Sequence, residues 1–484
     1  MDALVRDAAG ERAAPGTERE LRDVLAVSAA RTERELRDAL AVSAARTAGP
    51  RIPAGTFDQW LESRRRAHPF EVTRIPFAEL DGWAFHEDTG NLGHRSGGFF
   101  RVEGLDVRPA GGSAAPWRQP VLVQPESGVL GILAQKIDGV LHFLMQVKME
   151  PGNRGLLQLS PTVQATRSNF TGVHKGAAVR YLEYFTGPRR GRIVVDVLQS
   201  EHAAWFYRKN NRNMIVEVGP DEDVPLHDDF CWLPLGALHE LMARDNLVNM
   251  CTRSVLSCLP YAATTEEDPS APPLNSTPEV LSWFTGLRAD LRPEIGRVPL
   301  RDVPDWRRTD TEIARDDGRF FEIVAVSVRA ASREVSGWTQ PLLEPNGPGL
   351  AAGIVKEFGG VLHVLMRAEV EGGLLNVAEL GPTVQCRPGD FEAGERPLFH
   401  DYVTGADPAR VRFDAVQPEE GGRFSNAETR CLVVEADDSL PAELPPGYIW
   451  ITLGQLTELL RHGQYVNMHG RTLIACLHAM GRRP

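Results

Sequence analysis

The sequence predicts an α+β protein made of two tandem copies of one domain. The segment GVLHFLM at residues 139–145 returns 221 positions later as GVLHVLM at residues 360–366. Beyond a small insertion or deletion the offset becomes 218, because VNM at 248–250 pairs with VNM at 466–468. Within each copy the apolar residues mostly alternate, which indicates strands, and a late segment spaces them by three and four, which indicates a helix.

The domain boundaries follow from the repeat. Residues 51–262 form the first copy and residues 279–484 the second. ATTEEDPSAPPLNSTP, at 263–278, has the proline and polar content of a linker. Residues 1–50 form an N-terminal extension in which TERELRDVLAVSAAR is followed at once by TERELRDALAVSAAR. This tandem repeat favours a helix, either docked or in a poorly ordered tail, and we favour the tail.

Each copy contains a predicted hairpin and a helix. In the first copy the strands meet at Asp138-Gly139, and in the second at Gly359-Gly360. The helices are LGALHELM, from Leu235, and LGQLTELL, from Leu453. Alternation on the second strand of the first hairpin assigns one face to the core, namely Leu141, Phe143, Met145, Val147 and Met149.

The other face of that strand is mainly polar. It carries His142, Leu144, Gln146, Lys148 and Glu150, and the next segment presents Gln158, Ser160, Thr162, Gln164 and Thr166. Such rows form a solvent face or the floor of a polar pocket, and their Gln, Ser, Thr and His content favours a pocket. In the second copy Lys148 becomes Glu369, Gln146 becomes Arg367 and Gln158 becomes Glu379. We therefore expect a working pocket in the first copy alone.

Composition limits the class of protein. The formal net charge of −12 disfavours a nucleic-acid partner, because phosphate backbones are bound by basic surfaces. Six scattered cysteines form no C-x-x-C pair and are expected to be reduced thiols. No apolar run reaches the roughly 18 residues of a membrane helix, and MDALVRDAAGERAA lacks the apolar core of a signal peptide. We expect a cytoplasmic protein without a membrane partner.

A metal site is not expected in FHEDTGNLGHRSGGFF, at residues 85–100. His86, Glu87, Asp88 and His94 are potential ligands, but their spacing fits no standard helix-borne metal pair. A polar loop that closes over a site and a purely structural loop both remain open. Positive charge and aromatic rings gather instead in QATRSNFTGVHKG and WFYRKNNRNM, and the corresponding segments of the second copy carry less positive charge.

Several segments together resemble the NDP-hexose 2,3-dehydratase family of deoxysugar biosynthesis: FHEDTGNLGHRSGGFFRVEGL, QPESGVLGIL, GVLHFLMQVKMEPGN, LQLSPTVQATRSN and WFYRKNNRNM. The resemblance runs from about residue 57 to the C-terminus. It implies two Nudix-like repeats, a homodimer, the substrate dTDP-4-keto-6-deoxyglucose, and two nucleotide-sugar pockets of which one is catalytic. It also implies a bacterial antibiotic pathway in which a 3-ketoreductase takes the product.

The implied reaction removes water across C2 and C3 of the sugar. The C4 ketone acidifies the C3 proton, a base removes it, the enolate expels the C2 hydroxyl, and the enol becomes a 3,4-diketone. The reaction needs a base and acid, worth about 10² to 10⁴ in rate, and a donor at the enolate oxygen, worth about 3 kcal/mol. No G-x-G-x-x-G fingerprint follows a strand, so no nicotinamide or other cofactor is expected.

Candidate residues follow from the resemblance and the polar row. Lys148 is the candidate enolate partner or an ordinary strand lysine. The candidate bases are Glu150, Glu201 and His86, although Glu150 could merely pair with Lys148 and Glu201 could cap a helix. For substrate binding we expect Gln146, Gln164 and Asn169, with Arg167, Lys209 and Arg212 at the phosphates and Trp117 or Trp205 stacked on thymine.

Two other classes of function stay open. The Nudix signature, a helix with a G-x5-E-x7-R-E-x2-E-E type pattern, is missing from both copies. A nucleotide-sugar pyrophosphatase is therefore disfavoured, because such an enzyme needs those carboxylates to hold Mg²⁺. The third alternative is a sugar-nucleotide-binding scaffold without catalytic activity.

Overall fold

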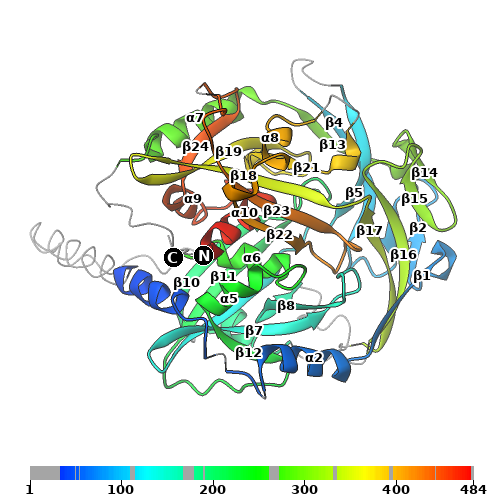
Figure 1. Cartoon of the computed structure of the whole chain (residues 1–484). Helices are drawn as coiled ribbons and strands as arrows, with labels where there is room; N and C mark the ends of the chain where they lie inside the picture. Colours follow the sequence, from blue (N-terminus) through cyan, green and yellow to red (C-terminus); the bar gives the residue numbers. More distant parts are fainter. Residues whose placement is uncertain are drawn as a thin grey trace, which may run out of the picture.

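The computed structural model describes residues 33–49, 51–53, 55–109, 115–166, 179–188, 191–260, 272–330, 335–391, 396–441 and 443–480. The α+β class is confirmed, because two seven-stranded sheets and two five-stranded sheets are accompanied by short helices. Figure 1 shows the main sheet of the first copy in the lower part of the view and that of the second copy above it. The smaller sheets lie at the right.

The main sheet of the first copy has the order β10-β11-β6-β7-β12, with β8 on β7 and β9 on β6. Its strands are β6 (Gly128–Ile137), β7 (Val140–Met149), β8 (Leu157–Pro161), β9 (Val163–Ala165), β10 (Arg192–Ser200), β11 (Asn210–Val218) and β12 (Phe230–Pro234). The sheet is mixed, because β11 runs parallel to β6 while the other pairs are antiparallel. The predicted hairpin is β6–β7, and its turn residues Asp138 and Gly139 have φ of 51° and 80°.

The second copy repeats this sheet. Its strands are β18 (Gly349–Phe358), β19 (Val361–Val370), β20 (Ala378–Gly381), β21 (Val384–Cys386), β22 (Val411–Pro418), β23 (Glu428–Glu435) and β24 (Tyr448–Thr452). The order along the main path is β20-β19-β18-β23-β22, and β18 and β23 are the parallel pair. Gly359 and Gly360, at φ of 58° and 82°, form the predicted turn between β18 and β19.

The two five-stranded sheets exchange their first strands between the copies. One contains β2 (Trp83–Phe85), β3 (Leu92–His94), β4 (Arg101–Arg108) and β5 (Trp117–Val123) from the first copy, and β13 (Glu294–Val298) from the second. The other contains β14 (Trp306–Arg308), β15 (Glu312–Arg315), β16 (Phe321–Ala330) and β17 (Gly337–Pro345) from the second copy, and β1 (Phe70–Ile75) from the first. Phe70 pairs with Ala330, and Glu294 with Arg108. Neither copy therefore completes its smaller sheet alone.

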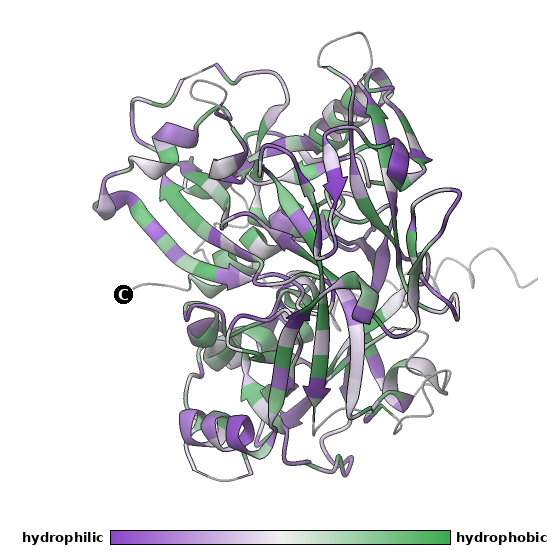
Figure 2. Ribbon diagram, turned by 90° about the vertical axis from the view of Figure 1, so that its right-hand side faces the viewer, coloured by the Kyte–Doolittle hydropathy of each residue, from purple (hydrophilic) through white to green (hydrophobic). Residues whose placement is uncertain are grey.

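Helices from both copies meet at the centre of the molecule. Besides the N-terminal helix described below, the described part of the chain forms α2 (Phe57–Ala67), α4 (Glu183–Thr186), α5 (Leu235–Met242), α6 (Met250–Leu256), α7 (Thr277–Asp290), α8 (His400–Thr404), α9 (Leu453–Leu459) and α10 (Met468–Ala479). Both predicted helices are present, as α5 and α9. Helices α6 and α10 pack on each other and on the two main sheets, and they share one hydrophobic core. Figure 2 shows hydrophobic bands along the strands that surround this centre.

Within the predicted linker, the described residues 272–276 lead directly into α7. Asn275 donates its side-chain amide to the Trp450 carbonyl at 2.8 Å. Ser276 caps α7 by accepting from the Glu279 amide, and the Glu279 side chain accepts in return from the Ser276 amide. The domain boundaries drawn from the repeat remain a prediction.

The N-terminal extension corrects one expectation. Residues 33–44, in the second 15-residue repeat, form a helix that docks on the first copy instead of a loose tail. Leu36 and Leu40 are 8% and 0% exposed within the core. Ser43 donates to the Leu141 carbonyl and accepts from the Leu235 amide, at 2.5 and 2.8 Å. The apolar face outweighs the flexibility expected near a terminus. The first repeat lies outside the described residues.

The predicted core face of β7 is confirmed, because its five apolar side chains are all buried. The opposite row is only partly a pocket floor. Leu144 lies in a second hydrophobic cluster, and Gln158, Ser160 and Thr162 are almost completely buried. Thr162 Oγ1 is hydrogen bonded to the Leu144 carbonyl. The pocket therefore involves the end of the row, at Lys148, Glu150 and Gln164.

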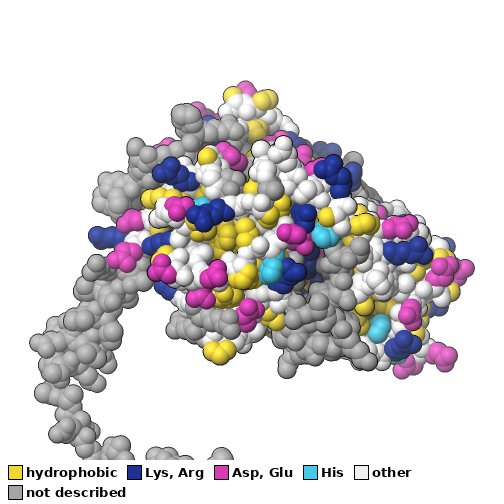
Figure 3. All heavy atoms as spheres, turned by 90° about the horizontal axis from the view of Figure 1, so that it is seen from below, with side chains coloured by type: hydrophobic (Ala, Val, Ile, Leu, Met, Phe, Trp, Pro, Cys, Tyr) yellow, Lys and Arg dark blue, Asp and Glu magenta, His cyan; other side chains and the backbone are white. Residues whose placement is uncertain are grey.

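The surface mixes both signs of charge. Figure 3 shows Lys and Arg interspersed with Asp and Glu around an apolar area on one face. No helix among the described residues has the length and apolar character needed to cross a membrane. All six cysteines are free thiols, as predicted, and five of them are buried.

Candidate active site

A cavity of about 310 Å³ lies where the main sheet of the first copy meets β17 and the loop after β22. The first copy contributes polar side chains that include Gln124, Lys148, Glu150, Gln164, Glu201 and Lys209. The second copy contributes Trp338, Thr339, Gln340, Glu420, Gly422 and Arg423. The cavity is therefore a composite of both copies, in keeping with the exchanged strands.

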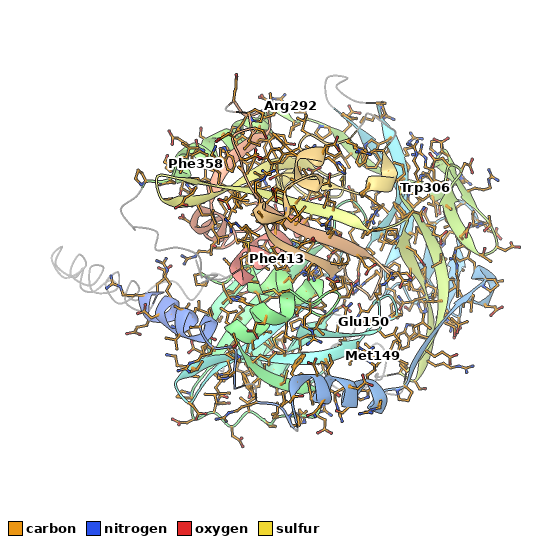
Figure 4. The ribbon with its side chains drawn as sticks, viewed as in Figure 1. Met149, Glu150, Arg292, Trp306, Phe358 and Phe413 are labelled. Atoms are coloured by element: carbon orange, nitrogen blue, oxygen red, sulfur yellow. The ribbon has the colours of Figure 1, made fainter. Side chains whose placement is uncertain are left out.

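Lys148 and Glu150 lie at the end of β7, where alternation directs them away from the core. The Lys148 ammonium is 2.8 Å from Glu150 Oε1 and donates to the Gln164 carbonyl at 3.2 Å. Only 13% of the lysine side chain and 7% of the glutamate side chain are exposed. Figure 4 labels Glu150 next to Met149 at this strand end. These contacts give the ammonium a defined position in the cavity wall.

Glu201 enters the cavity from the residue after β10. Its Oε2 accepts from the Asn211 side-chain amide at 2.5 Å, and its Oε1 accepts from the His202 amide at 3.3 Å. Asn211 also accepts from the Gly128 amide at 3.2 Å. Strands β6 and β11 thus fix the partner that orients this carboxylate, which is 4% exposed.

Two more cations meet in the same wall. Lys209 is 5% exposed and donates to the Glu126 carbonyl at 2.5 Å. Burial, together with the nearby charge of Arg423, lowers the pKa of Lys209 to about 8. Arg423 donates to Glu420 Oε1 at 3.1 Å and to Gln124 Oε1 at 3.0 Å. Burial acts to lower the pKa of Arg423, but Glu420, Glu150 and Glu201 outweigh it and raise that pKa.

Two buried arginines hold the main chain at the ends of β10 and β22, where the next loops begin. Arg471, on α10, donates to the carbonyls of Ser200 and Val466. Its counterpart Arg253, on α6, donates to the carbonyls of Pro418 and Val248 at 2.8 and 2.6 Å. Ser200 precedes Glu201, so an arginine of the second copy positions a carboxylate in the wall of the cavity.

The corresponding place in the second copy has lost both lysines. Lys148 corresponds to Glu369, and Lys209 to Ala427. Burial and the charge of Glu369 raise the pKa of Glu371, the counterpart of Glu150, to about 7. Burial likewise raises the pKa of Glu369 and of Glu379. An acidic group therefore replaces the Lys148 ammonium, as the sequence comparison indicates, and the Lys209 ammonium has no charged counterpart.

Several predicted site residues lie elsewhere. His86 belongs to the β2–β3 turn and is not part of the cavity wall, although His94 is. Gln146 is also outside the wall. Arg212 pairs with Asp196 on the neighbouring strand at 2.6 Å, and the second copy repeats this ion pair between Arg430 and Asp414 at 2.6 Å. A pair kept in both copies supports a structural role. Arg167 and Asn169 lie outside the described residues.

Neither of the two tryptophans expected to stack on the base lines the cavity. Trp117 is absent from the cavity wall, whereas its counterpart Trp338 lines it. Trp205 is 8% exposed and packs on Phe424 at a ring distance of 4.6 Å. Its counterpart, 218 residues later, is Arg423. Neither Trp117 nor Trp205 is therefore part of the cavity wall, where the sequence had placed them.

Sequence reasoning missed Trp338, Glu420 and Arg423. The repeat could be seen in the sequence, but alternation along one strand does not show which copy a strand faces. For Glu420 and Arg423 the one visible signal was an inequality between the copies, because the first copy has His202 and Trp205 at the equivalent positions.

The sequence profile of a family described as NDP-hexose 2,3-dehydratase matches residues 54–259 and 277–477. A protein of Amycolatopsis orientalis named dTDP-4-dehydro-6-deoxy-alpha-D-glucopyranose 2,3-dehydratase is 52% identical, over 88% of this chain and 90% of its own. A protein of the same name from Saccharopolyspora spinosa is 48% identical, over 89% and 92%. The crystal structure of an ADP compounds hydrolase aligns at a TM-score of 0.23 with 17% identity, over 35% of this chain and 92% of that chain, a likeness too low to bear on the fold.

Proposed function

Because the chain belongs to the NDP-hexose 2,3-dehydratase family, we propose that it dehydrates dTDP-4-keto-6-deoxyglucose in the composite cavity. The product is a dTDP-3,4-diketo-2,6-dideoxyhexose. The relatives' names supply the substrate, and one observation supports the place. Lys148 and Lys209 converge on this cavity, and their counterparts Glu369 and Ala427 carry no positive charge.

Lys148 stabilises the enolate in this proposal. Its ammonium is held by Glu150 and the Gln164 carbonyl, so it can donate a hydrogen bond to the sugar oxygen at C4 without reorganisation. A donor already fixed in a partly dehydrated wall stabilises developing charge more than a mobile donor does, because no orientation energy is spent during the reaction.

Glu201 is the proposed base. Asn211 holds one of its oxygens at 2.5 Å, and Arg471 fixes the main chain beside it. The carboxylate removes the C3 proton, and the electrons of that C–H bond form the enolate at C4. As the enolate collapses, the C2–O bond breaks, and the carboxyl group returns the proton to the departing hydroxide as water. The resulting enol at C3 then tautomerises, placing a proton on C2.

Lys209 and Arg423 bind the diphosphate. Ammonium and guanidinium groups complement phosphate oxygens, and the guanidinium offers several donors in one plane. Trp338, on β17, offers its ring to thymine. The second copy thus supplies both a phosphate ligand and a stacking surface to the pocket of the first.

The reaction is tested by mass spectrometry of one incubation with the keto sugar, without added metal. Loss of one water supports the dehydratase. A nucleoside monophosphate and a sugar phosphate formed with strict Mg²⁺ dependence identify a pyrophosphatase instead, and an unchanged keto sugar bound to the protein identifies a scaffold.

The cellular setting is part of the proposal. The free thiols are consistent with the reducing cytoplasm. A diketone that is chemically unstable needs prompt reduction, so a 3-ketoreductase of a deoxysugar pathway is the proposed next enzyme. We also propose a homodimer, and sedimentation of the full chain tests that assembly.

A further inference from the structure

Three polar side chains converge at the place in the second copy that corresponds to the cavity. His202 follows β10, Glu419 follows β22 and His469 is the second residue of α10. His202 and Glu419 are 3% exposed, and 17% of the His469 side chain is exposed. Among the residues that the structure describes, this is the group of three His, Cys, Asp or Glu side chains whose donor atoms all lie within 4.8 Å.

We propose that His202, Glu419 and His469 form a binding site for a divalent zinc ion. Two imidazoles and one carboxylate are a ligand set that Zn²⁺ commonly accepts, with the fourth position left to water or another ligand. This site lies outside the catalytic cavity, and the proposal does not rest on the proposed dehydratase activity.

The distances suit such an ion. His202 Nε2 lies 2.8 Å from Glu419 Oε2, and His469 Nε2 lies 3.4 Å from Glu419 Oε1. Tetrahedral ligation at about 2.1 Å separates donor atoms by roughly 3.4 Å. The His469 contact already has that span, but the two imidazoles approach different oxygens of the carboxylate, so ligation through one oxygen requires a change in side-chain orientation. Side-chain rotation provides such a change without a shift of the main chain.

The surroundings of the cluster favour a cation. Thr429 donates to Glu419 Oε1 at 2.5 Å and so orients the carboxylate, as outer partners of metal ligands do. Glu379 Oε1, in the same acidic region, is a buried oxygen without a hydrogen-bond partner.

The equivalent positions at the catalytic cavity hold no histidine. The counterparts of His202, Glu419 and His469 are Glu420, Glu201 and Cys251. A simple buried ion pair needs one imidazole, and one is already present at 2.8 Å. The second imidazole, at the exposed edge, completes a chelate that joins His202 of the first copy to two residues of the second. Its exposure leaves an open position on that side.

The test measures zinc in the full-length chain, purified without chelator, by inductively coupled plasma mass spectrometry. The expected content is about one ion per chain. His202→Ala and His469→Ala should each lose it, while Cys251→Ala, the matched change in the first copy, should retain it. His469→Cys should also retain it, because a thiolate replaces the imidazole as ligand. Circular dichroism of each variant checks folding.

Cobalt provides a second readout. Co²⁺ added to the metal-free chain should give visible absorption bands, and His469→Cys should add a sulfur-to-metal band. The proposal is overturned if the wild-type chain holds no zinc and gains none on titration, or if either histidine variant holds as much as the wild type. Neither outcome concerns turnover, so the proposed dehydratase function would stand or fall separately.

Discussion

Lys209 should make nucleotide binding depend on pH. The side chain is buried, and burial together with Arg423 lowers its pKa to about 8. Below that pH the ammonium is present and binds the diphosphate; above it the amine is neutral and the attraction is lost. The terminal phosphate of dTDP titrates near pH 6, so it stays ionised throughout the range that matters.

The magnitude follows from the titration. If only the protonated lysine binds, the inhibition constant of dTDP rises about tenfold between pH 7 and pH 9. Lys209→Met should weaken inhibition at pH 7 by about 1.5 to 3 kcal/mol, roughly ten- to a hundredfold, which is the value of a hydrogen bond to a charged group. Lys209→Arg keeps a permanent charge and should remove the fall in affinity up to pH 9.

The same lysine should lower stability. A pKa of about 8 in the folded chain, against 10.5 for an ordinary lysine, means that the unfolded chain holds the proton more tightly. Stability is therefore lower below pH 8 and rises between pH 8 and about 10.5. Lys209→Met should raise the free energy of unfolding at pH 7 by at most about 3 kcal/mol while it weakens binding, a combination typical of a functional residue.

The assay is competitive inhibition by dTDP of keto-sugar turnover, which reports only on the catalytic pocket. Denaturant unfolding of the same samples gives the stability. A pH-independent inhibition constant in the wild-type chain, or an Lys209→Met variant that is less stable and binds dTDP unchanged, would refute the assignment of Lys209 to the diphosphate.

Three further results are expected. Lys148→Met should reduce kcat by about 10²-fold, since a fixed donor at the enolate is worth about 3 kcal/mol, and it should leave dTDP inhibition intact; near-normal turnover would remove Lys148 from the mechanism. Trp338→Ala should raise KM for the keto sugar, because the variant loses the roughly 1–3 kcal/mol of a base stack, whereas Trp117→Ala should leave KM unchanged. The reverse ranking would invalidate the composite pocket. Leu40→Ala should lower the free energy of unfolding by about 2 to 5 kcal/mol in a denaturant titration, and a change within error would show that the docked helix contributes no stability.

The repeat and the strand pattern made much of the fold predictable. A side-chain period of two placed Leu141, Phe143 and Met145 on the core side, and the turn residues marked both hairpins. The docked helix at residues 33–44 was underestimated. Its apolar stripe is short, and only the structure shows that Leu36 and Leu40 pack into the main hydrophobic core.

The site was predictable only for the residues that one copy supplies. Lys148, Glu150, Gln164, Glu201 and Lys209 all line the cavity. The strand exchange that brings in residues of the second copy depends on pairing between segments at least 186 positions apart. Such pairing leaves no periodic signal in a single sequence, so the opposite destinations of the paired tryptophans could not be deduced from it.

A structure of the full-length chain bound to a dTDP-sugar would decide where the chemistry takes place. The proposed site places the diphosphate beside Lys209 and Arg423 and the hexose between Lys148 and Glu201. A nucleotide sugar bound only beside Glu371 in the second copy, with the composite cavity vacant, would contradict it.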